Sequence, residues 1–580
     1  MASTVSGSLI TRNYTNFRGV DFSNRKDEIS LVRSPDALNM WKNYKNNSGK
    51  SIETRPAIEL LTEYSDTING LFFYTINGIK HKIVHAGTRL YDETTVKYTS
   101  MSNSKSNFFV YGNKLYIKDG SKYLTYDGTT VSEVIGYIPT TSISRMPSGG
   151  GTIYEDVNLL TGIRKNSFVA DGASKEYVLD VESYDSDYTV RVWINDEERL
   201  GGFTASPTTG KVTFTTAPPV PATTGQDNVV IQFKKSVSGY RERIEKCTLL
   251  ELFDNRVFFS GNPDYPNVLW HCSLNDPTYC SDLDYYEEGT DDSSIKTIIS
   301  GNNALWVMKE PSQTNTTVFY HNPTIDSEYG KIYPSVHSSI STGCISTGIN
   351  FNDDICFFSE RGLEAISGDV TTEQILAHRS SLVDSKLLNE AKYNNVILEE
   401  WEGYLLAFVG NKVYLADSRE LVTINDHNEY EWFYWELKKD ITSTCVKDGV
   451  LYLCSGKEIY TLTDYSNTRE IESYFTTLDD EFHYPQYQKI TNKKGFVADI
   501  EGSSITISVK TDNNKFEKVN TYNNVKGYIV ARIKKKKWKS ISLKFSSNTP
   551  FSVYSCTLES YIGAYVKRWE RSKTWQQIII

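Results

Sequence analysis

Short apolar stretches with a period of two residues recur along most of the chain, and turn-forming residues bound each of them. The stretch from Gly112 to Gly128 reads GNKLYIKDGSKYLTYDG, in which Leu115 and Ile117 alternate with more polar neighbours. Phrases of the same form begin at His81, Gly410 and Gly449. Alternation bounded by Gly, Asn and Asp is typical of short antiparallel strands joined by tight turns.

The spacing of these phrases predicts the architecture. Repeats of about 40–50 residues, each a small antiparallel sheet, indicate the blades of a β-propeller. The repeats occur on both sides of a segment with a different style, which favours one propeller interrupted by an insertion. An irregular set of β-sandwiches, whose hairpins look alike locally, is the alternative.

Changes in style along the chain divide it into domains. The flexible sequence PSGGGT at residues 147–152 precedes a segment in which Val190, Val192 and Ile194 alternate, as in a compact β-sandwich. After about residue 465 the strands carry charged rims and indicate an antiparallel β-domain. We therefore predict an all-β fold with five parts: an N-terminal arm (1–60), first propeller blades (61–150), an inserted β-sandwich (151–240), further blades (241–465) and a C-terminal β-domain (466–580).

Three local predictions follow from turn and helix chemistry. A two-residue turn at Asp448-Gly449 places Cys445 opposite Tyr452 and leaves Cys454 too far away for a disulfide. The best helical stretch is Ser380–Asn395. Ser34-Pro35-Asp36 suits the start of a single helical turn, with Ser34 as its cap.

Composition and charge exclude several classes of protein. The 580 residues are 39% hydrophobic and 13% aromatic, which suits packed β-structure and not disorder. We expect no membrane-spanning helix, because no apolar run is long enough. The start MASTVSGSLITRNYTNF lacks the pattern of a secretory signal, so we expect no export by that route. The net charge of −10 argues against a surface that coats nucleic acid.

No motif in the sequence carries recognisable catalytic chemistry. His271, Cys272 and Cys280 form the tightest His/Cys group, but a zinc site needs a fourth ligand. The acidic stretch Asp282–Asp292 lacks the order of a calcium loop, so a solvated loop is the better interpretation. Neighbouring carboxylates such as Asp353-Asp354 and Asp479-Asp480-Glu481 point to opposite faces of a strand, unlike a glycosidase pair. We therefore predict no enzymatic activity and assign no catalytic, cofactor-binding or metal-binding residue.

One basic run, RIKKKKWKS, contains Lys534–Lys537. Lysines on an edge strand keep it from sticking to other sheets, and this is the favoured interpretation. Contact with phosphates or with an acidic partner is the alternative.

Three elements of the first sixty residues, Asn16–Phe22, Ser34–Met40 and Thr54–Pro56, lead into the first blade-like strands. This opening resembles that of the tail hub, nozzle or "stabilisation" proteins (tail tubular protein B-like) of tailed, especially short-tailed, bacteriophages. The resemblance implies a structural virion protein, made in the host cytoplasm and located in the tail.

The same resemblance implies the partners of the chain. Such proteins form a homo-oligomeric ring, commonly six-fold, below the portal and its adaptor, and genomic DNA passes through the ring without specific binding. Two alternatives stay open: a tail-tip or baseplate propeller that binds or cleaves host-surface carbohydrate, and a hub component of a long-tailed particle.

Overall fold

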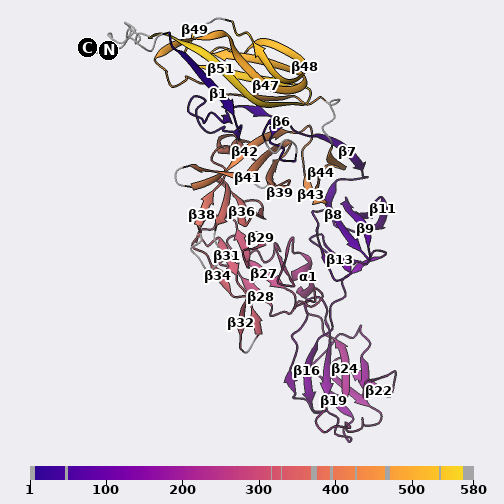
Figure 1. Ribbon diagram of the computed structural model, residues 1–580. Coiled ribbons are helices and arrows are strands. Elements are labelled where there is room, and N and C mark those ends of the chain that lie inside the picture. Colours follow the sequence, from indigo (N-terminus) through magenta and orange to yellow (C-terminus); the bar gives the residue numbers. More distant parts are fainter. Residues whose placement is uncertain are drawn as a thin grey trace, which may run out of the picture. The chain divides into compact units, whose positions relative to one another are not determined.

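The computed structural model describes residues 7–45, 50–314, 316–327, 330–367, 375–391, 396–424, 427–463, 470–534 and 537–565 (Figure 1). Over these residues strands dominate, and the helices are the short α1 (Tyr240–Glu245) and α2 (Asp384–Glu390). Neither helix is long or apolar enough to cross a membrane. The all-β class that the alternation predicts is confirmed.

Seven four-stranded sheets, the unit from which propellers are built, recur along the described chain. Six of them are formed by strands that follow one another in sequence, apart from small excursions. In chain order they are β8 (Ile68–Ile76), β9 (Ile79–Ala86), β10 (Arg89–Asp92), β11 (Thr95–Tyr98); β12 (Asn107–Tyr111), β13 (Lys114–Lys118), β14 (Tyr123–Tyr126), β15 (Val131–Glu133); β25 (Leu249–Phe253), β26 (Arg256–Ser260), β27 (Val268–His271), β28 (Tyr285–Glu287); β29 (Ile295–Gly301), β30 (Ala304–Lys309), β31 (Val318–His321), β34 (Ser335–His337); β35 (Gly348–Phe351), β36 (Asp354–Ser359), β37 (Gly362–Ser367), β38 (Ile375–His378); and β39 (Val396–Trp401), β40 (Tyr404–Val409), β41 (Lys412–Ile424), β42 (His427–Glu436). Strands β32 (Thr324–Asp326) and β33 (Gly330–Ile332) form a small hairpin of their own.

The seventh sheet combines the two ends of the blade-like region. Strands β43 (Ser443–Lys447), β44 (Val450–Ser455) and β45 (Glu458–Thr463) are joined by β7 (Ala57–Glu63) from near the N-terminus. Leu462 lies opposite Ile58 in this antiparallel pair, and Lys457 forms an ion pair with Glu63. An early strand thus completes the last sheet of the series.

The recurring sequence phrase corresponds to a recurring turn. In six of the seven sheets, a two-residue loop joins the first strand to the second, and both loop residues have positive φ. These pairs are Asn77-Gly78, Asp254-Asn255, Asn302-Asn303, Asn352-Asp353, Glu402-Gly403 and Asp448-Gly449. Positive φ at both positions defines the type I′ turn, whose twist matches that of the strands, and Asn, Asp and Gly tolerate it best. The repeated turn residues therefore specify the first hairpin of each sheet.

Inner strands are buried on both faces, as sheets packed face to face require. On β13, Leu115 and Ile117 join a core with the preceding sheet, which supplies Ile83 and Leu90. Tyr116 on the opposite face joins a different core with the following sheet. The sheet β12–β15 therefore packs between its neighbours, which is the arrangement of consecutive propeller blades.

The segment between β15 and β25 forms two further sheets. The six-stranded sheet has the order β17 (Thr152–Ile153), β16 (Thr140–Arg145), β18 (Ile163–Phe168), β24 (Val229–Lys234), β20 (Arg191–Ile194), β21 (Glu197–Arg199), and the three-stranded sheet has the order β19 (Glu176–Val178), β23 (Lys211–Phe214), β22 (Phe203–Ser206). Val192, Phe233 and Val212 come from both sheets and share one core. The segment is a β-sandwich inserted into the series of four-stranded sheets, and it begins with β16, before residue 151, where the sequence placed its start.

Two leucines in the loop between β17 and β18 belong to a different core. Leu159 and Leu160 pack with residues of β12–β15 and β25–β28. The amide of Leu159 donates to the carbonyl of Cys280 (2.8 Å). The amide of Lys235 donates to the carbonyl of Gly162 (2.8 Å), so the chain leaves the sandwich close to where it enters.

The C-terminal sheet contains strands from both ends of the sequence. Its ten strands run in the order β4 (Ala37–Leu38), β46 (Ser473–Thr476), β50 (Ile541–Ser547), β47 (Tyr487–Thr511), β51 (Phe551–Tyr565), β6 (Ile52–Thr54), β5 (Met40–Trp41), with β1 (Leu9–Thr15) paired to β51 and with β48 (Glu517–Ala531) and β49 (Lys537–Trp538) paired to β47. Two further short strands, β2 (Gly19–Val20) and β3 (Arg33–Ser34), form a parallel pair.

The described chain separates into two compact units. The terminal unit comprises residues 1–63, 356–367 and 376–580, and the central unit comprises residues 64–355 and 368–375. The N-terminal arm and the C-terminal sheet share the terminal unit, whereas the inserted sandwich lies in the central unit.

Local predictions had mixed outcomes. The register around Asp448-Gly449 is confirmed, with Cys445 opposite Tyr452, and none of the eight cysteines, all of which lie in the described ranges, forms a disulfide. Ser34-Pro35-Asp36 is not helical: Ser34 Oγ does accept from the Asp36 amide (3.2 Å), but the chain continues into β4. The predicted helix at Ser380–Asn395 is shorter, Asp384–Glu390, and its last residues lie outside the described ranges. The middle of the Lys534–Lys537 run also lies outside them.

Candidate functional site

The His/Cys group predicted as the closest approach to a metal site is part of the hydrophobic core. Cys272 and Cys280 are buried in the cluster that also contains Trp270. Burial raises the pKa of Cys272 to about 12 and that of Cys280 well above its usual range, which disfavours the thiolate that binds metals. Burial likewise lowers the pKa of His271 to about 4. Nowhere in the described ranges do three potential ligands converge on a metal position.

The acidic stretch Asp282–Asp292 is largely exposed, as its sequence suggests, but it is not a loop throughout. It contains strand β28, and Glu288 at its centre is fully buried. The carboxylate of Glu288 lies 3.0 Å from His321 Nε2 and accepts from Ser335 Oγ (2.6 Å). The Lys309 ammonium donates to the carbonyl of Glu288 (2.7 Å), so a cationic side chain stands where a calcium ion would need oxygens alone.

The adjacent carboxylates near the C-terminal sheet are engaged in separate ion pairs. Asp480 accepts from Arg12 at 2.7 and 3.0 Å and from the Tyr14 hydroxyl at 2.9 Å. Asp479 pairs instead with Lys510 (2.6 Å). The two carboxylates therefore serve different cations, one of them supplied by β1, and do not converge as a glycosidase pair does.

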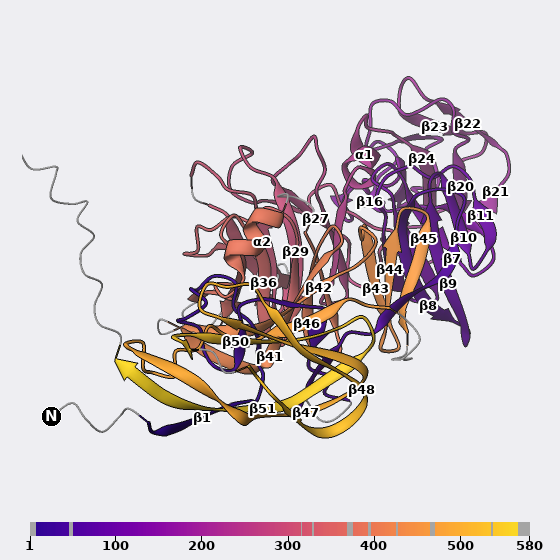
Figure 2. The ribbon, with the colours of Figure 1, turned by 90° about the horizontal axis from the view of Figure 1, so that it is seen from above.

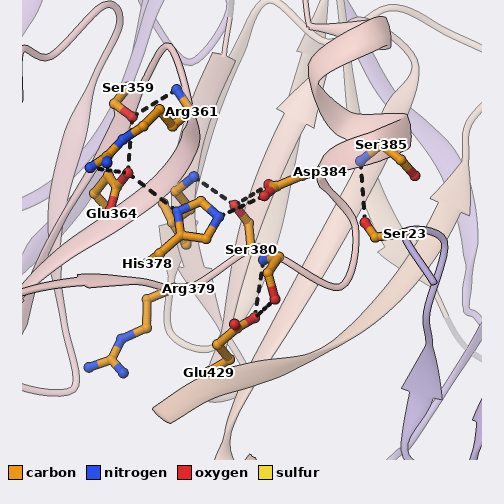
Figure 3. A network of polar contacts seen from close by, with 12 residues as sticks. Ser23, Ser359, Arg361, Glu364, His378, Arg379, Ser380, Asp384, Ser385 and Glu429 are labelled. Carbon is orange, nitrogen blue, oxygen red and sulfur yellow. Dashed lines mark hydrogen bonds and ion pairs between the residues drawn. The ribbon is translucent and has the colours of Figure 1, made fainter. Parts of the chain in front are cut away.

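The densest polar network surrounds His378, at the end of β38 (Figure 3). His378 Nε2 lies 2.6 Å from Asp384 Oδ2, and Nδ1 lies 3.3 Å from Glu364 Oε1. Arg361 also pairs with Glu364 (3.1 Å), and Ser380 Oγ donates to Asp384 Oδ1 (2.6 Å). Strands β37 and β38 and the start of α2 supply these side chains, and the sequence pattern gave no sign that they would meet.

The network favours a protonated imidazole at neutral pH over the neutral form that a catalytic base requires. Burial alone would lower the pKa of His378, but the hydrogen bonds to Asp384 and Glu364 outweigh it and raise the pKa to about 10. Both ring nitrogens are occupied by carboxylates, and Ser380 donates to Asp384 and not to the imidazole. A serine nucleophile requires a neutral histidine that accepts its proton, so this constellation cannot activate Ser380.

The same network connects α2 to the N-terminal arm. Ser385 Oγ donates to the carbonyl of Phe22 (2.7 Å), and the Ser385 amide donates to Ser23 Oγ (3.3 Å; Figure 3). The Phe22 amide in turn donates to the carbonyl of Leu382 (2.7 Å). The role that the contacts support is mechanical: they fasten the arm to α2 and the residues just before it.

A second seam joins the arm to β42. Arg33 forms a two-point ion pair with Glu431, at 2.8 and 2.7 Å, and both side chains are buried. Asn39, at φ 57, accepts from Arg55 Nε (2.8 Å) and from the Glu436 amide (2.9 Å). The side chains of Arg33, Asn39 and Arg55 are thus hydrogen-bonded to other segments of the chain.

Aromatic packing and a close backbone approach complete that seam, which we call the arm seam (Asn16–Phe22, Arg33–Trp41 and Thr54–Pro56 with their contacts on β42). Trp41 stacks on Trp401 and meets Trp435 edge-on, with ring centroids 5.6 and 5.4 Å apart. A Cβ on Gly19 would lie 2.0 Å from the carbonyl oxygen of Trp432, and its φ of +124° also favours glycine. Asn39, Arg55 and Gly19 of this seam lie in the segments that carry the sequence resemblance, and Arg33 and Trp41 lie next to one of them.

An open groove lies on the inserted sandwich. It has a volume of about 460 Å³ and is lined by Tyr184, Tyr188 and Phe203 together with an exposed Arg191–Glu198 ion pair. The Arg191 guanidinium also lies over the Trp193 ring, 4.9 Å from its centroid. Sequence reasoning did not anticipate this groove.

Comparison with known proteins adds little to this picture. The sequence matches no protein family and no curated protein. BamB from Moraxella catarrhalis is similar in structure with a TM-score of 0.30 and 10% identity, over 72% of this chain and 100% of that chain. An exo-beta-1,3-galactanase from Phanerochaete chrysosporium gives a TM-score of 0.22 and 10% identity, over 53% of this chain and 95% of that chain. The description of the fold therefore rests on the chain's own sheets and turns.

Proposed function

We propose that this chain is a structural protein of a bacteriophage tail, a nozzle or hub subunit that forms a ring below the portal and adaptor. The observation that carries the proposal is the arm seam. It contains Asn39, which belongs to the segments on which the resemblance rests, and Arg33, which directly precedes one of them, and both join the N-terminal arm to the sheet that contains β42. A motif used for joining parts of a rigid protein suits a structural component.

The polar clusters support a structural role as well. His378 is held between two carboxylates, and the thiols of Cys272 and Cys280 are buried with raised pKa values. The net charge of −10 suits a wall past which DNA moves, because a lysine-lined surface would hold phosphates in a salt-dependent way. In this proposal the six-fold symmetry and the DNA path come from the family resemblance.

Imaging of native particles by electron microscopy tests the proposal. We expect density for this chain in a ring on the tail axis, between the adaptor and the distal end of the tail. Density in the capsid shell, or in fibres away from the DNA path, would refute it.

A second function, binding of host-surface carbohydrate, is favoured by the groove on the inserted sandwich. Aromatic rings beside charged hydrogen-bonding groups suit the apolar faces and hydroxyls of sugars. Glu198 is the carboxylate in the lining and is paired with Arg191, so the groove favours binding over cleavage. Glycan-array binding of the isolated chain, lost in Tyr188→Ala, would support this function over a purely structural one.

A further inference from the structure

Two strands of the C-terminal sheet lie at opposite edges of one continuous set of four. Strand β1 pairs with β51, β51 pairs with β47, and β47 pairs with β48. Figure 2 shows these strands together in the terminal unit. Within the described residues, no strand pairs with the outer side of β1 or of β48. Both strands therefore present backbone groups to which another strand can bond.

The direction of the strands makes these edges complementary. All three pairings are antiparallel, so β1 and β48 run in opposite directions. If β48 of one copy is placed beside β1 of another, the two strands are antiparallel and the alternation of the sheet continues. The seven residues of β1 extend about 24 Å at 3.4 Å per residue, and the end of β48 beyond Gly527 can pair with part of this length.

Apolar side chains lie at both edges, on the same face of the sheet. On β48, Tyr528 is 77% exposed and Val530 is 57% exposed. On β1, Leu9 is 49% exposed, and it lies opposite the exposed Tyr561 of β51. Val530 lies opposite Val497, Val497 lies opposite Thr557, and Thr557 lies opposite Asn13. Asn13 and Leu9 are an even number of positions apart on β1, so Val530 and Leu9 lie on the same face of the sheet. A joined sheet would bring both apolar sets to one surface.

Edge strands of this kind are usually protected, and β48 has partial protection. Asn524 (φ 50) and Gly527 (φ 109) interrupt its regular geometry. The hydroxyl of Tyr522 donates to the carbonyl of Val530 (3.3 Å), which occupies one outward position. The segment Tyr528–Ala531 beyond the irregularity contains no proline and no charged residue. It therefore lacks the residues that usually prevent an edge strand from pairing with another strand.

We propose that β48 of one copy pairs with β1 of the next copy, so that the C-terminal sheets join head to tail. The contact uses two different surfaces of the same chain, which is the type of interface that generates closed rings when the rotation closes. The inference rests on the proposed function for the expectation that a ring forms, and it adds the element that joins the copies.

Cysteine cross-linking of the full chain tests the pairing directly. The native thiols interfere little, because seven of the eight are buried and Cys445 is half-buried. Under mild oxidation we expect the double variant Leu9→Cys/Val530→Cys to form a ladder of covalent oligomers, and each single variant to remain uncross-linked. Dimers from Val530→Cys alone would indicate a symmetric β48–β48 contact and overturn the proposal.

Charge substitution provides an independent test. Tyr528→Lys/Val530→Lys places two charges on the edge, and we expect at least a tenfold loss of assembly by analytical ultracentrifugation. Ile79→Lys is the matched control, since Ile79 is similarly exposed, at 62%, in a hairpin of the central unit. Circular dichroism verifies that each variant is folded. Equal assembly of the edge variant and the control would overturn the proposal, as would a chain that neither assembles nor cross-links at its highest soluble concentration.

These results are distinguishable from those that test the tail location. Cross-linking through Leu9 and Val530 in a protein found outside the tail would refute the proposed function and retain the head-to-tail contact. A tail ring in which β1 and β48 of neighbouring copies lie apart would support the proposed function and refute the head-to-tail contact.

Discussion

The buried ion pair between Arg33 and Glu431 allows a quantitative test of whether the N-terminal arm is an integral part of the terminal unit. Its two contacts are 2.8 and 2.7 Å long, and the side chains are only 8% and 2% exposed. Removing one partner of such a pair costs about 3–5 kcal/mol, because the other charge stays buried without compensation. Arg18 Nη1 lies 3.7 Å from Glu431 and offers some compensation. We therefore expect Arg33→Met to lower the stability of this contact by about 3 kcal/mol, the lower limit of that range.

Native-state hydrogen exchange measures this loss at the seam itself. The Asp21 amide donates to the carbonyl of Ser34, and the Asn39 amide donates to the carbonyl of Tyr434. At 1.4 kcal/mol per tenfold, a loss of about 3 kcal/mol speeds the exchange of both amides about 100-fold.

Two further variants make the test specific. Arg25→Met removes an equal charge from the same arm, but Arg25 is 72% exposed and its pair with Glu28 is worth less than about 0.5 kcal/mol. The double variant Arg33→Met/Glu431→Leu removes both charges and should recover most of the loss, because apolar replacement of a buried pair is often nearly neutral. Unchanged exchange in Arg33→Met would refute the claim that this pair holds the arm.

Three other predictions follow from the structure. Because the pKa of His378 is raised from 6.5 to about 10, its contribution to folding stability is complete below pH 6.5 and is lost as the pH rises through 10. The melting temperature of the protein should therefore fall more steeply over this range than that of His378→Gln. Parallel curves of melting temperature against pH would contradict the assignment. Replacing residues 141–154 and 163–234 by short turns should remove the sandwich and leave a protein that is folded by circular dichroism. Leu160→Ala in the intact chain should instead lower the free energy of unfolding in urea by about 2–5 kcal/mol. A deletion that unfolds the chain would show that the sandwich is required. Alkylation of the native protein near pH 8 should label Cys445 first, and earlier labelling of any of the seven buried cysteines, read by mass spectrometry, would contradict their burial.

Much of the fold could be predicted because its signals are local. The turn at Asp448-Gly449 set the register of its hairpin, since positive φ at both residues selects one turn type. The same logic applies to Asn77-Gly78 and the other paired turns, so the all-β class and the blade-like sheets follow from residues close in sequence.

Pairings between distant segments could not be predicted in this way. The alternation in β1 says that it is a strand, but nothing in it names β51 as the partner. The network around His378 also escaped prediction, because Glu364, His378 and Asp384 meet only once β37, β38 and α2 are packed. The predicted helical turn at Ser34-Pro35-Asp36 is wrong for the same reason. Its local capping bond forms, but pairing of β4 with β46 determines the backbone beyond it.

The pairing of β7 with β45 has a consequence for how the protein is made. Glu63 leaves the ribosome long before its partner strand position Glu458 is synthesised. At about 5–20 residues per second, the early strand waits some 20–80 seconds for the segment that completes its sheet. A chain released early by the ribosome therefore keeps β7 unpaired and cannot finish this sheet. Only polypeptides translated past residue 463 contain both strands, so completion of this sheet depends on nearly the full length of the blade-like region.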